Sequence, residues 1–510
     1  MRNLSKLIFQ RVVVVSLAIL LQIAFLLVGM LWLQEYRFWM RTVINVLAWL
    51  LVIGIMSGRS NPSYKIAWIV LILAFPVAGL TIYVLFGGNK TSHRWNHKRA
   101  QSELTVLQHL RQNPDTLQSL AGTPDAAFNH ARFLLRSASY PIYDNSSAQY
   151  FSCGEDCWAQ MLEELKQARH YIFLEFFIIA PGQMWDSILE ILQQKALEGV
   201  DVRVLYDDFG CITRLPGRYC KQLREMGIQA HAFAPYVPVL SGRLNNRDHR
   251  KLMIIDGQAA FTGGVNLADE YINRTSPHGH WKDCGILVKG GAVWSMTVMF
   301  LANWDTVAQL QEDVDSFRPF YTAPEGETHG YLQPFADSPL DDEDVGATIY
   351  QQLIMSAKRT VRVMTPYLIL DHQMTQALCN AAKTGVDVRI ITPGVPDKWY
   401  VHAVTRANYE VLTEAGVRIY EYRPGFIHSK VCLSDDCYAV VGTVNMDFRS
   451  LYLHYEDAVY LYDADAIADI ARDFEETFPV CREITYQRCK HVYLHQRILR
   501  TLLRMFSPLM

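Results

Sequence analysis

Two short stretches of this chain carry the same reactive side chains at the same spacing. Each has a histidine, a lysine two residues later, an aspartate five residues after the lysine and, further on, a glycine and an asparagine. The first stretch contains His249, Lys251, Asp256, Gly263 and Asn266, and the second contains His428, Lys430, Asp435, Gly442 and Asn445. One such pattern can arise by chance, but two copies without an insertion predict a paired catalytic site.

A pair of histidines suits displacement at phosphorus. A neutral imidazole is a nucleophile, and a covalent phosphoryl-histidine splits one difficult displacement into two easier ones. A second imidazole, on the other side of the phosphate, donates a proton to the leaving alcohol and then accepts one from the incoming alcohol. We therefore predict that His249 and His428 act as this pair. Lys251, Lys430, Asn266 and Asn445 would surround the non-bridging oxygens and stabilise the charge that develops on them.

No cofactor and no metal ion are expected for this chemistry. The ten cysteines are scattered along the chain. Neither Cys153 with Cys157 nor Cys432 with Cys437 has a nearby pair of histidines, which a zinc site of this kind would require. No cluster of carboxylates indicates a magnesium site. The positive charge at the phosphate would come from the lysines instead.

Each motif is expected to lie on a strand that ends in a hairpin. A histidine and a lysine two residues apart on a strand point to the same face, and the residues between and after them face a buried layer. Asp256-Gly257 and Asp435-Asp436 are turn signals, and residues 259–261 and 438–441 are the return strands. This position predicts a structural or orienting role for the two motif aspartates, rather than contact with a substrate.

The chain beyond the first 124 residues is a duplication. Residues 195–203 match residues 381–389, and in both a helical pattern ends at a glycine before a strand, at 200–206 and 386–392. Matching helices and strands lie upstream and downstream of both. Such alternation predicts an α/β fold. We place a linker at 91–124, a first lobe at 125–325 and a second lobe at 326–510.

With two motifs and a duplication, the chain resembles the phospholipase D superfamily, whose two motifs meet at one active site. The whole chain is similar to the bacterial cardiolipin synthase branch, closely so at residues 445–450, Asn-Met-Asp-Phe-Arg-Ser. The resemblance implies two phospholipase D-like α/β/α sandwich lobes that form a pseudo-dimer. It also implies that Asp283 and Glu456 hydrogen-bond the motif histidines and fix their tautomers. Arg449 is a candidate for holding a lipid phosphate, although a structural salt bridge is the simpler interpretation.

The first 90 residues carry three apolar segments, at about 12–33, 42–58 and 66–88. A membrane span needs about 20 apolar residues, so we predict N-terminal transmembrane helices. A signal peptide is the alternative for the first segment, but its apolar core is too long and no small-residue cleavage site follows. The other two segments match the usual N-terminal hairpin of the synthases.

The predicted location is the cell membrane, with several spans and a cytoplasmic catalytic part. Lys90, Arg94, Lys98 and Arg99 follow the last apolar segment and favour the cytoplasmic side for what comes next. Three spans would then put Arg2, Lys6 and Arg11 outside, against the same rule. The orientation is therefore left open.

The C-terminal residues predict a basic amphipathic helix. Six cations and one acid lie between 482 and 510, and Ile498, Leu499, Leu502 and Met505 recur at helical spacing. The cations are Arg482, Arg488, Lys490, Arg497, Arg500 and Arg504. Such a helix binds an anionic membrane surface. The alternative is an ordinary helix whose apolar stripe packs on the second lobe.

The resemblance implies a membrane phosphatidyltransferase that makes cardiolipin and glycerol from two phosphatidylglycerol molecules through a phosphatidyl-histidine, with His249 favoured as the nucleophile. The expected partners are these lipids and the bilayer. A hydrolytic phospholipase D and a phosphatidylserine synthase are alternatives within the superfamily. A nuclease would need a basic groove. The net charge of −3 argues against it, so no nucleic-acid partner is expected. A non-enzymatic membrane scaffold would have lost motif residues, and none is missing. The oligomeric state is open.

Overall fold

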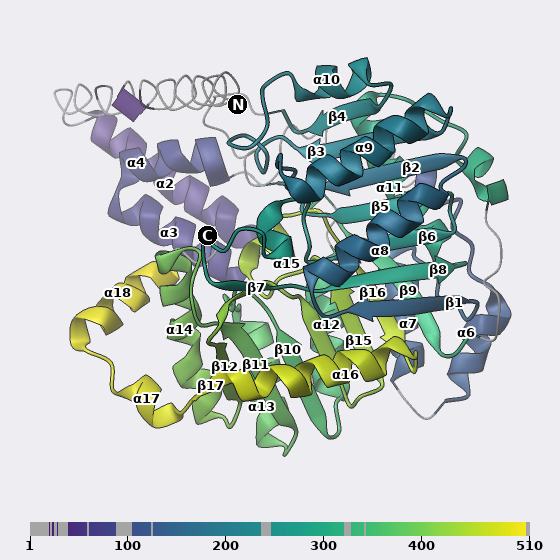
Figure 1. The fold of residues 1–510 in the computed structure, drawn as a ribbon. Coiled ribbons are helices and arrows are strands. Elements are labelled where there is room, and N and C mark those ends of the chain that lie inside the picture. The colour runs from purple at the N-terminus through teal and green to yellow at the C-terminus, as the bar shows by residue number, and fades with distance from the viewer. Residues whose placement is uncertain are drawn as a thin grey trace.

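A computed structural model describes residues 39–58, 61–87, 105–123, 126–235, 246–320, 328–340 and 343–505, together with positions 20, 23, 24 and 28. Two large β-sheets, each with helices against it, dominate the molecule (Figure 1). The first apolar segment, at 12–33, lies almost wholly outside the described residues.

The first lobe is built on a sheet with the strand order β1-β8-β6-β5-β2-β3-β4. Its strands are β1 (Ser146–Phe151), β2 (Tyr171–Phe176), β3 (Asp201–Asp207), β4 (Gln229–Phe233), β5 (Lys251–Ile255), β6 (Ala259–Gly263) and β8 (Gly285–Gly290). Its helices are α8 (Gly154–Gln167), α9 (Gln183–Leu197), α10 (Tyr219–Glu225), η4 (Asp269–Ile272), α11 (Val293–Ala308) and η5 (Val314–Phe320).

The second lobe is built on a sheet with the order β17-β12-β11-β10-β14-β15-β16-β9. Its strands are β9 (Tyr331–Asp337), β10 (Thr360–Met364), β11 (Asp387–Pro393), β12 (Arg418–Tyr422), β14 (Val431–Ser434), β15 (Tyr438–Gly442), β16 (Glu456–Tyr462) and β17 (Cys481–Ile484). Its helices are α12 (Val345–Ser356), α13 (His372–Lys383), α14 (Trp399–Glu414), α15 (Phe448–Tyr452), α16 (Ala466–Thr477), η6 (Phe478–Val480), α17 (Tyr486–Lys490) and α18 (Leu494–Met505).

The two sheets have the same topology, so the predicted duplication is confirmed. In both, three parallel strands, β2-β3-β4 or β10-β11-β12, continue into antiparallel strands on the other side. These antiparallel runs are β5-β6-β8-β1 and β14-β15-β16-β9. The second sheet adds β17 at its outer edge, against β12.

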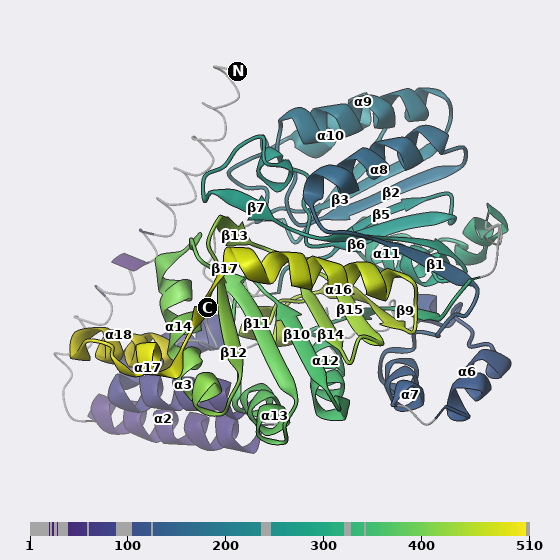
Figure 2. The same cartoon turned by 60° about the horizontal axis from the view of Figure 1, so that its bottom comes forward.

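In the first lobe, helices cover both faces of the sheet. Ile172 and Leu174 of β2 belong to the cluster that includes Trp185 and Ile188 of α9. The intervening Phe173 points the other way and stacks on Phe300 of α11, with ring centroids 4.6 Å apart. Figure 2 shows α8 and α9 together over one face of this sheet. Successive strand residues point to opposite faces, so a sheet buried on both sides needs apolar residues at every position.

Both predicted hairpins are present. β5 pairs with β6 and β14 with β15, in each case antiparallel. Asp256 and Gly257 have positive φ angles of 52° and 65°, and Asp435 and Asp436 have 54° and 57°. Positive φ at both central residues is the geometry of the tight turn that matches the twist of the flanking strands, and aspartate and glycine tolerate it.

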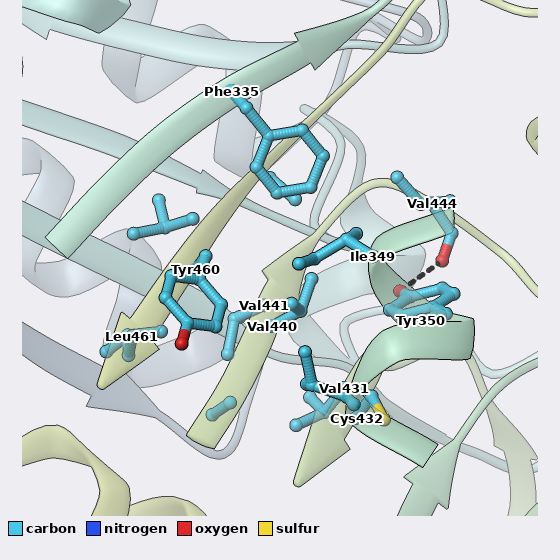
Figure 3. Packing of buried hydrophobic residues seen from close by; sticks show 14 of the residues in the cluster. Phe335, Ile349, Tyr350, Val431, Cys432, Val440, Val441, Val444, Tyr460 and Leu461 are labelled. Carbon is cyan, nitrogen blue, oxygen red and sulfur yellow. Dashed lines mark hydrogen bonds between the residues drawn. The ribbon is translucent and has the colours of Figure 1, made fainter. Parts of the chain in front are cut away.

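The lobes share one hydrophobic core. Residues of α11 in the first lobe and of β9, β15 and β16 in the second lobe belong to the same buried cluster. Figure 3 shows part of it, around Val440, Val441 and Tyr460. There the hydroxyl of Tyr350 donates to the carbonyl of Val444, at 2.9 Å, and so fixes the backbone next to Asn445. A common core makes the two lobes one packed unit.

The other two apolar segments form a compact group of helices. They are α2 (Trp39–Ser57), α3 (Pro62–Ala74), α4 (Pro76–Ile82) and η2 (Tyr83–Gly87). In the part of the chain that the structure describes, no helix meets the length and apolarity that crossing a membrane requires. The group rests on the second lobe, where Phe448 joins its apolar cluster and Asn61 donates to Asp371 at 3.0 Å.

Two helices that lie in the sequence between this group and the first sheet pack on the second lobe. They are α6 (Pro114–Ala121) and α7 (Ala127–Ala138). His130 of α7 lies within hydrogen-bonding distance of the hydroxyl of Tyr460, at 3.1 Å, and its ring meets that of Tyr438 edge-on. Helices α6 and α7 therefore pack on the second lobe, although they precede the first sheet in the sequence. The proposed boundaries at 91, 125 and 326 stay predictions.

Candidate active site

The two motifs meet because each histidine strand pairs with a strand from the other lobe. The amide of His249 donates to the carbonyl of Tyr455, at 2.9 Å, and the amide of His428 donates to the carbonyl of Lys282, at 2.7 Å. On the second side this contact is a short parallel ladder of β7 (His280–Lys282) and β13 (Gly425–Ile427). Both histidines are therefore held at the joint between the lobes.

Each histidine is also paired with a carboxylate of the other lobe. Nδ1 of His249 lies 2.8 Å from Oε2 of Glu456, and Nδ1 of His428 lies 2.7 Å from Oδ2 of Asp283. Both acids are fully buried. A carboxylate at Nδ1 holds the proton there and leaves the lone pair on Nε2, which is the tautomer that a nucleophile needs. The two acids expected to orient the histidines thus lie where that role requires them.

The single difference within the motif, Gly264 against Thr443, matches the two different acids. A Cβ at position 264 would lie 1.8 Å from Oδ1 of Asp283, so only glycine leaves room for this carboxylate. At the equivalent place the hydroxyl of Thr443 donates a short hydrogen bond to Glu456. The glycine makes space for one acid and the threonine positions the other.

The two lysines lie with their histidines in the buried site. Nζ of Lys251 donates to the carbonyl oxygen of His249, at 2.6 Å, and Nζ of Lys430 donates to that of His428. Burial lowers the pKa of Lys251 to about 7 and that of Lys430 to about 8. A phosphate between the lobes would restore the charge on both, because an anion favours the protonated form.

Burial also lowers the pKa values of the two histidines. It lowers the pKa of His249 to about 3 and that of His428 to about 4, so both are neutral in the empty site near pH 7. Burial by itself would raise the pKa of Glu456 and of Asp283, but their contacts with the histidines outweigh it and hold both pKa values below the usual range. The site therefore holds two neutral imidazoles, each beside an ionised carboxylate.

The two asparagines differ in what they contact. Oδ1 of Asn266 accepts from the amide of Ile178, at 2.9 Å, and its Nδ2 donates to the hydroxyl of Tyr271, at 2.8 Å. Oδ1 of Asn445 is buried and has no hydrogen-bond partner among the described residues. Asn266 is thus occupied with protein groups, whereas the amide of Asn445 has unused hydrogen-bonding capacity.

The motif aspartates lie apart from the histidines and lysines, at the far ends of β5 and β14. The carboxylate of Asp256 accepts from the amides of Arg169, His170 and Tyr171, at 2.7 to 2.8 Å. Asp435 does the same at the start of β10, where it accepts from three successive amides of residues 358–360, at 2.7 to 2.9 Å. Each aspartate ties the hairpin turn to the beginning of the neighbouring strand.

The motif pattern did not predict several buried polar residues of the site. Asp457 accepts from the amide of Lys251, at 3.2 Å, and from the hydroxyl of Thr262. His454 lies beside His249, with ring centroids 5.6 Å apart. In the described part of the chain, His249, His454 and Glu456 form the group whose ligand atoms lie close enough together, within 4.8 Å, to hold a metal ion. The repeat could have pointed to these residues. When Glu456 is aligned with Asp283, the run His454-Tyr-Glu-Asp457 aligns with Trp281-Lys-Asp-Cys284.

The salt-bridge interpretation of Arg449 is wrong. Its guanidinium forms no ion pair with a described residue, and its Nε is buried without a hydrogen-bond partner. Asp447, the nearest acid along the chain, caps α15: its Oδ1 accepts from the amides of Arg449 and Ser450, at 2.8 and 3.0 Å.

A family model described as "Cardiolipin synthase, PLD-like domain" matches residues 161–276 and 350–478, one block in each lobe. A second model, "Phospholipase_D-nuclease N-terminal", matches residues 43–88. The cardiolipin synthase of Geobacillus kaustophilus is 35% identical over 467 residues, which are 90% of this chain and 91% of that protein. An uncharacterized protein of Streptococcus mutans is 40% identical over 466 residues, 90% of this chain and 99% of that one.

A solved structure, the phosphatidylserine synthase of Haemophilus influenzae Rd KW20, shares the fold. The TM-score is 0.55 at 14% identity, and the match covers 75% of this chain and 97% of that chain. At this identity the likeness concerns the arrangement of the sheets and helices.

Proposed function

The chain belongs to the cardiolipin synthase family of phospholipase D-like enzymes, and we propose that it transfers a phosphatidyl group from one phosphatidylglycerol to another. The products are cardiolipin and glycerol. One observation carries the proposal: two neutral, buried imidazoles from different lobes, each with its Nδ1 on a buried carboxylate. A neutral imidazole with a free Nε2 is the nucleophile, and the other imidazole becomes the proton donor once it is protonated beside its carboxylate.

In the first half of the reaction, Nε2 of one histidine attacks phosphorus. The N–P bond forms and the P–O bond to glycerol breaks, and the electron pair stays on the glycerol oxygen. That oxygen takes a proton from Nε2 of the other histidine, which is an imidazolium in the substrate complex because the bound phosphate and its own carboxylate both favour the charged form. The resemblance favours His249 as the attacking residue and His428 as the acid. Glu456 and Asp283 hold the two rings and stabilise the imidazolium form when it occurs.

In the second half, a terminal hydroxyl of another phosphatidylglycerol takes the place of the glycerol. The histidine that gave up its proton now removes one from this hydroxyl, the new O–P bond forms and the N–P bond breaks. Lys251 and Lys430, with Asn445, face the charge that develops on the non-bridging oxygens. Since water competes with the lipid for the phosphatidyl-enzyme, a lipid acceptor delivered from a membrane favours transfer.

We also propose that the N-terminal helices hold the enzyme at the membrane, with the catalytic lobes on the cytoplasmic side. The support is the match of residues 43–88 to the N-terminal family model and the exposed apolar surface of α2, which includes Val46, Leu50 and Ile53. An exposed apolar patch of this kind is rare on a soluble monomer and typical of a membrane or protein contact.

The test is lipid analysis of the purified full chain supplied with phosphatidylglycerol as its sole lipid. We expect cardiolipin and glycerol in equal amounts. Phosphatidic acid without cardiolipin would identify a hydrolytic phospholipase D instead. Phosphatidylserine formed on addition of serine, without cardiolipin from phosphatidylglycerol, would identify the other alternative.

A further inference from the structure

The two pseudo-equivalent halves of the site differ in chemistry next to each histidine. Two residues before each orienting acid, one lobe has Trp281 and the other has His454. The indole of Trp281 lies 5.4 Å from the ring of His428, and the imidazole of His454 lies 5.6 Å from the ring of His249. The same position is thus apolar on one side and able to bind a polar ligand on the other.

The residues before the histidines differ in the same sense. Two positions before each motif histidine, the first lobe has Arg247 and the second has Phe426. Phe426 stacks on its own histidine, with ring centroids 5.9 Å apart. Arg247 is buried, 3.9 Å from Asp207 and over the ring of Phe209. At this position one half of the site is therefore aromatic and the other is basic.

Arg449 is a second arginine on the basic half, and unlike Arg247 it forms no ion pair with a described residue. Arg449 of α15 makes no side-chain hydrogen bond or ion pair with any residue that the structure describes, and its Nε is buried. Burial lowers the pKa of its guanidinium. Asp447 acts in the opposite sense, and the charge of Arg247 lowers the pKa further. Arg247 is paired with Asp207, and the carboxylate of Asp447 caps a helix, so the charge of Arg449 is the one that an anion would balance.

His454 is a second polar group without a hydrogen bond from its ring, although the ring lies at ion-pair distance from Glu456. Its side chain is 10% exposed, yet neither ring nitrogen has a hydrogen-bond partner among the described residues. Its Nδ1 lies 3.6 Å from Oε1 of Glu456, beyond hydrogen-bonding distance. Its amide donates to the carbonyl of Arg449, at 3.0 Å, so the two residues are joined through the backbone. A buried polar group without a hydrogen bond is unfavourable, and a ligand that supplies the hydrogen bond removes that cost.

These groups lie on the side of the molecule that carries the N-terminal helices. Phe448 and Tyr452, the neighbours of Arg449 on α15, pack against that group of helices. Tyr400, an electrostatic neighbour of Arg449, and the adjacent Trp399 are exposed at the start of α14. Exposed aromatic side chains are typical of a membrane–water interface.

We propose that Arg449, with His454 and Arg247 beside it, forms a second phosphate site that binds the phosphodiester of the acceptor phosphatidylglycerol. The inference rests on the proposed function, because it concerns the second substrate of that reaction. The acceptor carries its own phosphate one glycerol away from the hydroxyl that attacks. Glycerol and water carry none. A guanidinium binds a phosphate through two parallel hydrogen bonds, so the site selects a phospholipid acceptor over neutral ones.

The test compares two reactions that use the same donor. The full chain, in mixed micelles with phosphatidylglycerol, makes cardiolipin, and it also exchanges labelled glycerol into phosphatidylglycerol. Only the first acceptor has a phosphate. We expect Arg449→Gln to lower the ratio of cardiolipin formation to glycerol exchange by about tenfold or more, as loss of one charge-assisted contact implies. Arg449→Lys should restore part of the ratio, because it keeps the charge and loses the paired hydrogen bonds.

Arg362→Gln is the matched control, since Arg362 of β10 pairs with Asp436 and Glu475 away from the site. It should leave the ratio unchanged. The ratio does not depend on how much protein folds. A ratio that stays at the wild-type value in Arg449→Gln overturns the second phosphate site. A wild-type enzyme that exchanges glycerol but makes no cardiolipin overturns the proposed function instead.

Inorganic phosphate separates a lipid site from a site for free phosphate. For a lipid site, phosphate should inhibit cardiolipin formation weakly, and only far above the concentration of the lipid acceptor. Saturable inhibition by phosphate below that concentration, lost in Arg449→Gln, would overturn the assignment to a lipid.

Discussion

Each motif histidine depends on a carboxylate that the other lobe supplies. Glu456 lies beside His249 and Asp283 beside His428, and all four side chains are buried. In a site with little water, a carboxylate at Nδ1 keeps Nε2 free to attack or to accept a proton. Neither lobe by itself contains a complete histidine–acid pair, because each pair joins one residue from each lobe.

Replacement of either histidine should abolish turnover. We expect His249→Ala and His428→Ala each to lower the rate by about 10³-fold or more, since one removes the nucleophile and the other the proton donor. A metal chelator should leave the wild-type rate intact. Labelled phosphatidylglycerol should give an acid-labile adduct on one of these two histidines.

His372→Ala, at an exposed position on α13, is the control and should be fully active. Strong inhibition by EDTA that a divalent ion reverses would contradict the metal-free mechanism. Label on a serine or cysteine would contradict the phosphohistidine.

The two lysines predict how the rate falls at high pH. Burial lowers the pKa of Lys251 to about 7 and that of Lys430 to about 8. A lysine with a lowered pKa is charged below that value and loses its charge as the pH rises through it. We therefore expect kcat/KM, which reports the free enzyme, to fall as the pH rises through 7 to 8. Bound phosphate raises both pKa values, so kcat should fall at a higher pH than kcat/KM.

The measurement is a pair of pH profiles over the alkaline range. In Lys251→Arg the side chain keeps its charge at high pH. The decrease of kcat/KM in the alkaline range should therefore be smaller, even if the maximum value of kcat/KM is lower. An alkaline limb at the same pH in kcat and kcat/KM would show that the lysines do not face the phosphate.

Among the elements, the hairpins at the ends of β5 and β14 tie the motif strands to their neighbours. Asp256 and Asp435 each accept three amide hydrogen bonds at the start of the neighbouring strand. A carboxylate is well suited to this, because its two oxygens accept several hydrogen bonds at once. The spacing that the two motifs share follows from the length of this hairpin.

The C-terminal helix α18 turns its apolar face outward. Ile498, Leu499 and Leu502 are exposed, whereas Leu503 packs against Ile369, Val401 and Val404 of the second lobe. Arg497 lies 3.9 Å from Glu410 of α14. The helix thus leaves most of its apolar stripe uncovered, unlike an ordinary helix packed on the lobe. In both views it lies on the same side as α2 and α3 (Figure 1, Figure 2).

We predict that α18 binds an anionic membrane surface. A peptide of residues 490–510 should become helical on phosphatidylglycerol vesicles, and less so on phosphatidylcholine vesicles. Each basic residue near an anionic surface contributes about 1 kcal/mol, so changing Arg497, Arg500 and Arg504 to Glu should weaken binding by about 100-fold or more. Circular dichroism during a lipid titration measures this. Binding that is insensitive to the reversal and to salt would make α18 a structural helix only.

At the scale of the whole molecule, the lobes act as one unit because contacts at their joint also hold the site. Nζ of Lys282 donates to Oδ1 of Asp473 on α16, at 2.6 Å, and the hydroxyl of Tyr150 donates to Oδ2, at 2.7 Å. The carbonyl oxygen of Lys282 also accepts a hydrogen bond from the amide of His428, and Lys282 directly precedes Asp283. One buried acid of the second lobe thus anchors the segment of the first lobe that orients His428.

Removing this acid should destabilise the enzyme. We expect Asp473→Asn to lower the free energy of unfolding by about 3 to 5 kcal/mol, because it leaves the charge of Lys282 buried and unpaired. Asp469→Asn is the control on the same helix, since its ion pair with Arg472 is exposed and contributes about 0 to 1 kcal/mol. Thermal unfolding of both variants in detergent gives the comparison. Equal stabilities would show that the buried pair at the joint contributes nothing.

Short-range patterns in the sequence determined a large part of this protein. The two motifs, their hairpins and the duplication are all encoded by spacings of a few residues, and the structure confirms the hairpins and the repeated topology. The roles of the motif residues in the reaction stay predictions. The membrane spans also stay predictions, and the segment at 12–33 lies almost entirely outside the described residues.

Only the tertiary structure decided which acid serves which histidine, and which polar groups near them lack a partner. Glu456 and His249 lie 207 positions apart in the chain, so no local pattern relates them. Arg449 was expected to form a structural salt bridge, but its side chain makes no ion pair with a described residue, and Oδ1 of the neighbouring Asp447 caps α15. The physical reason is the same in both cases: a motif determines which way a side chain points, whereas the packing of the two sheets determines what it meets.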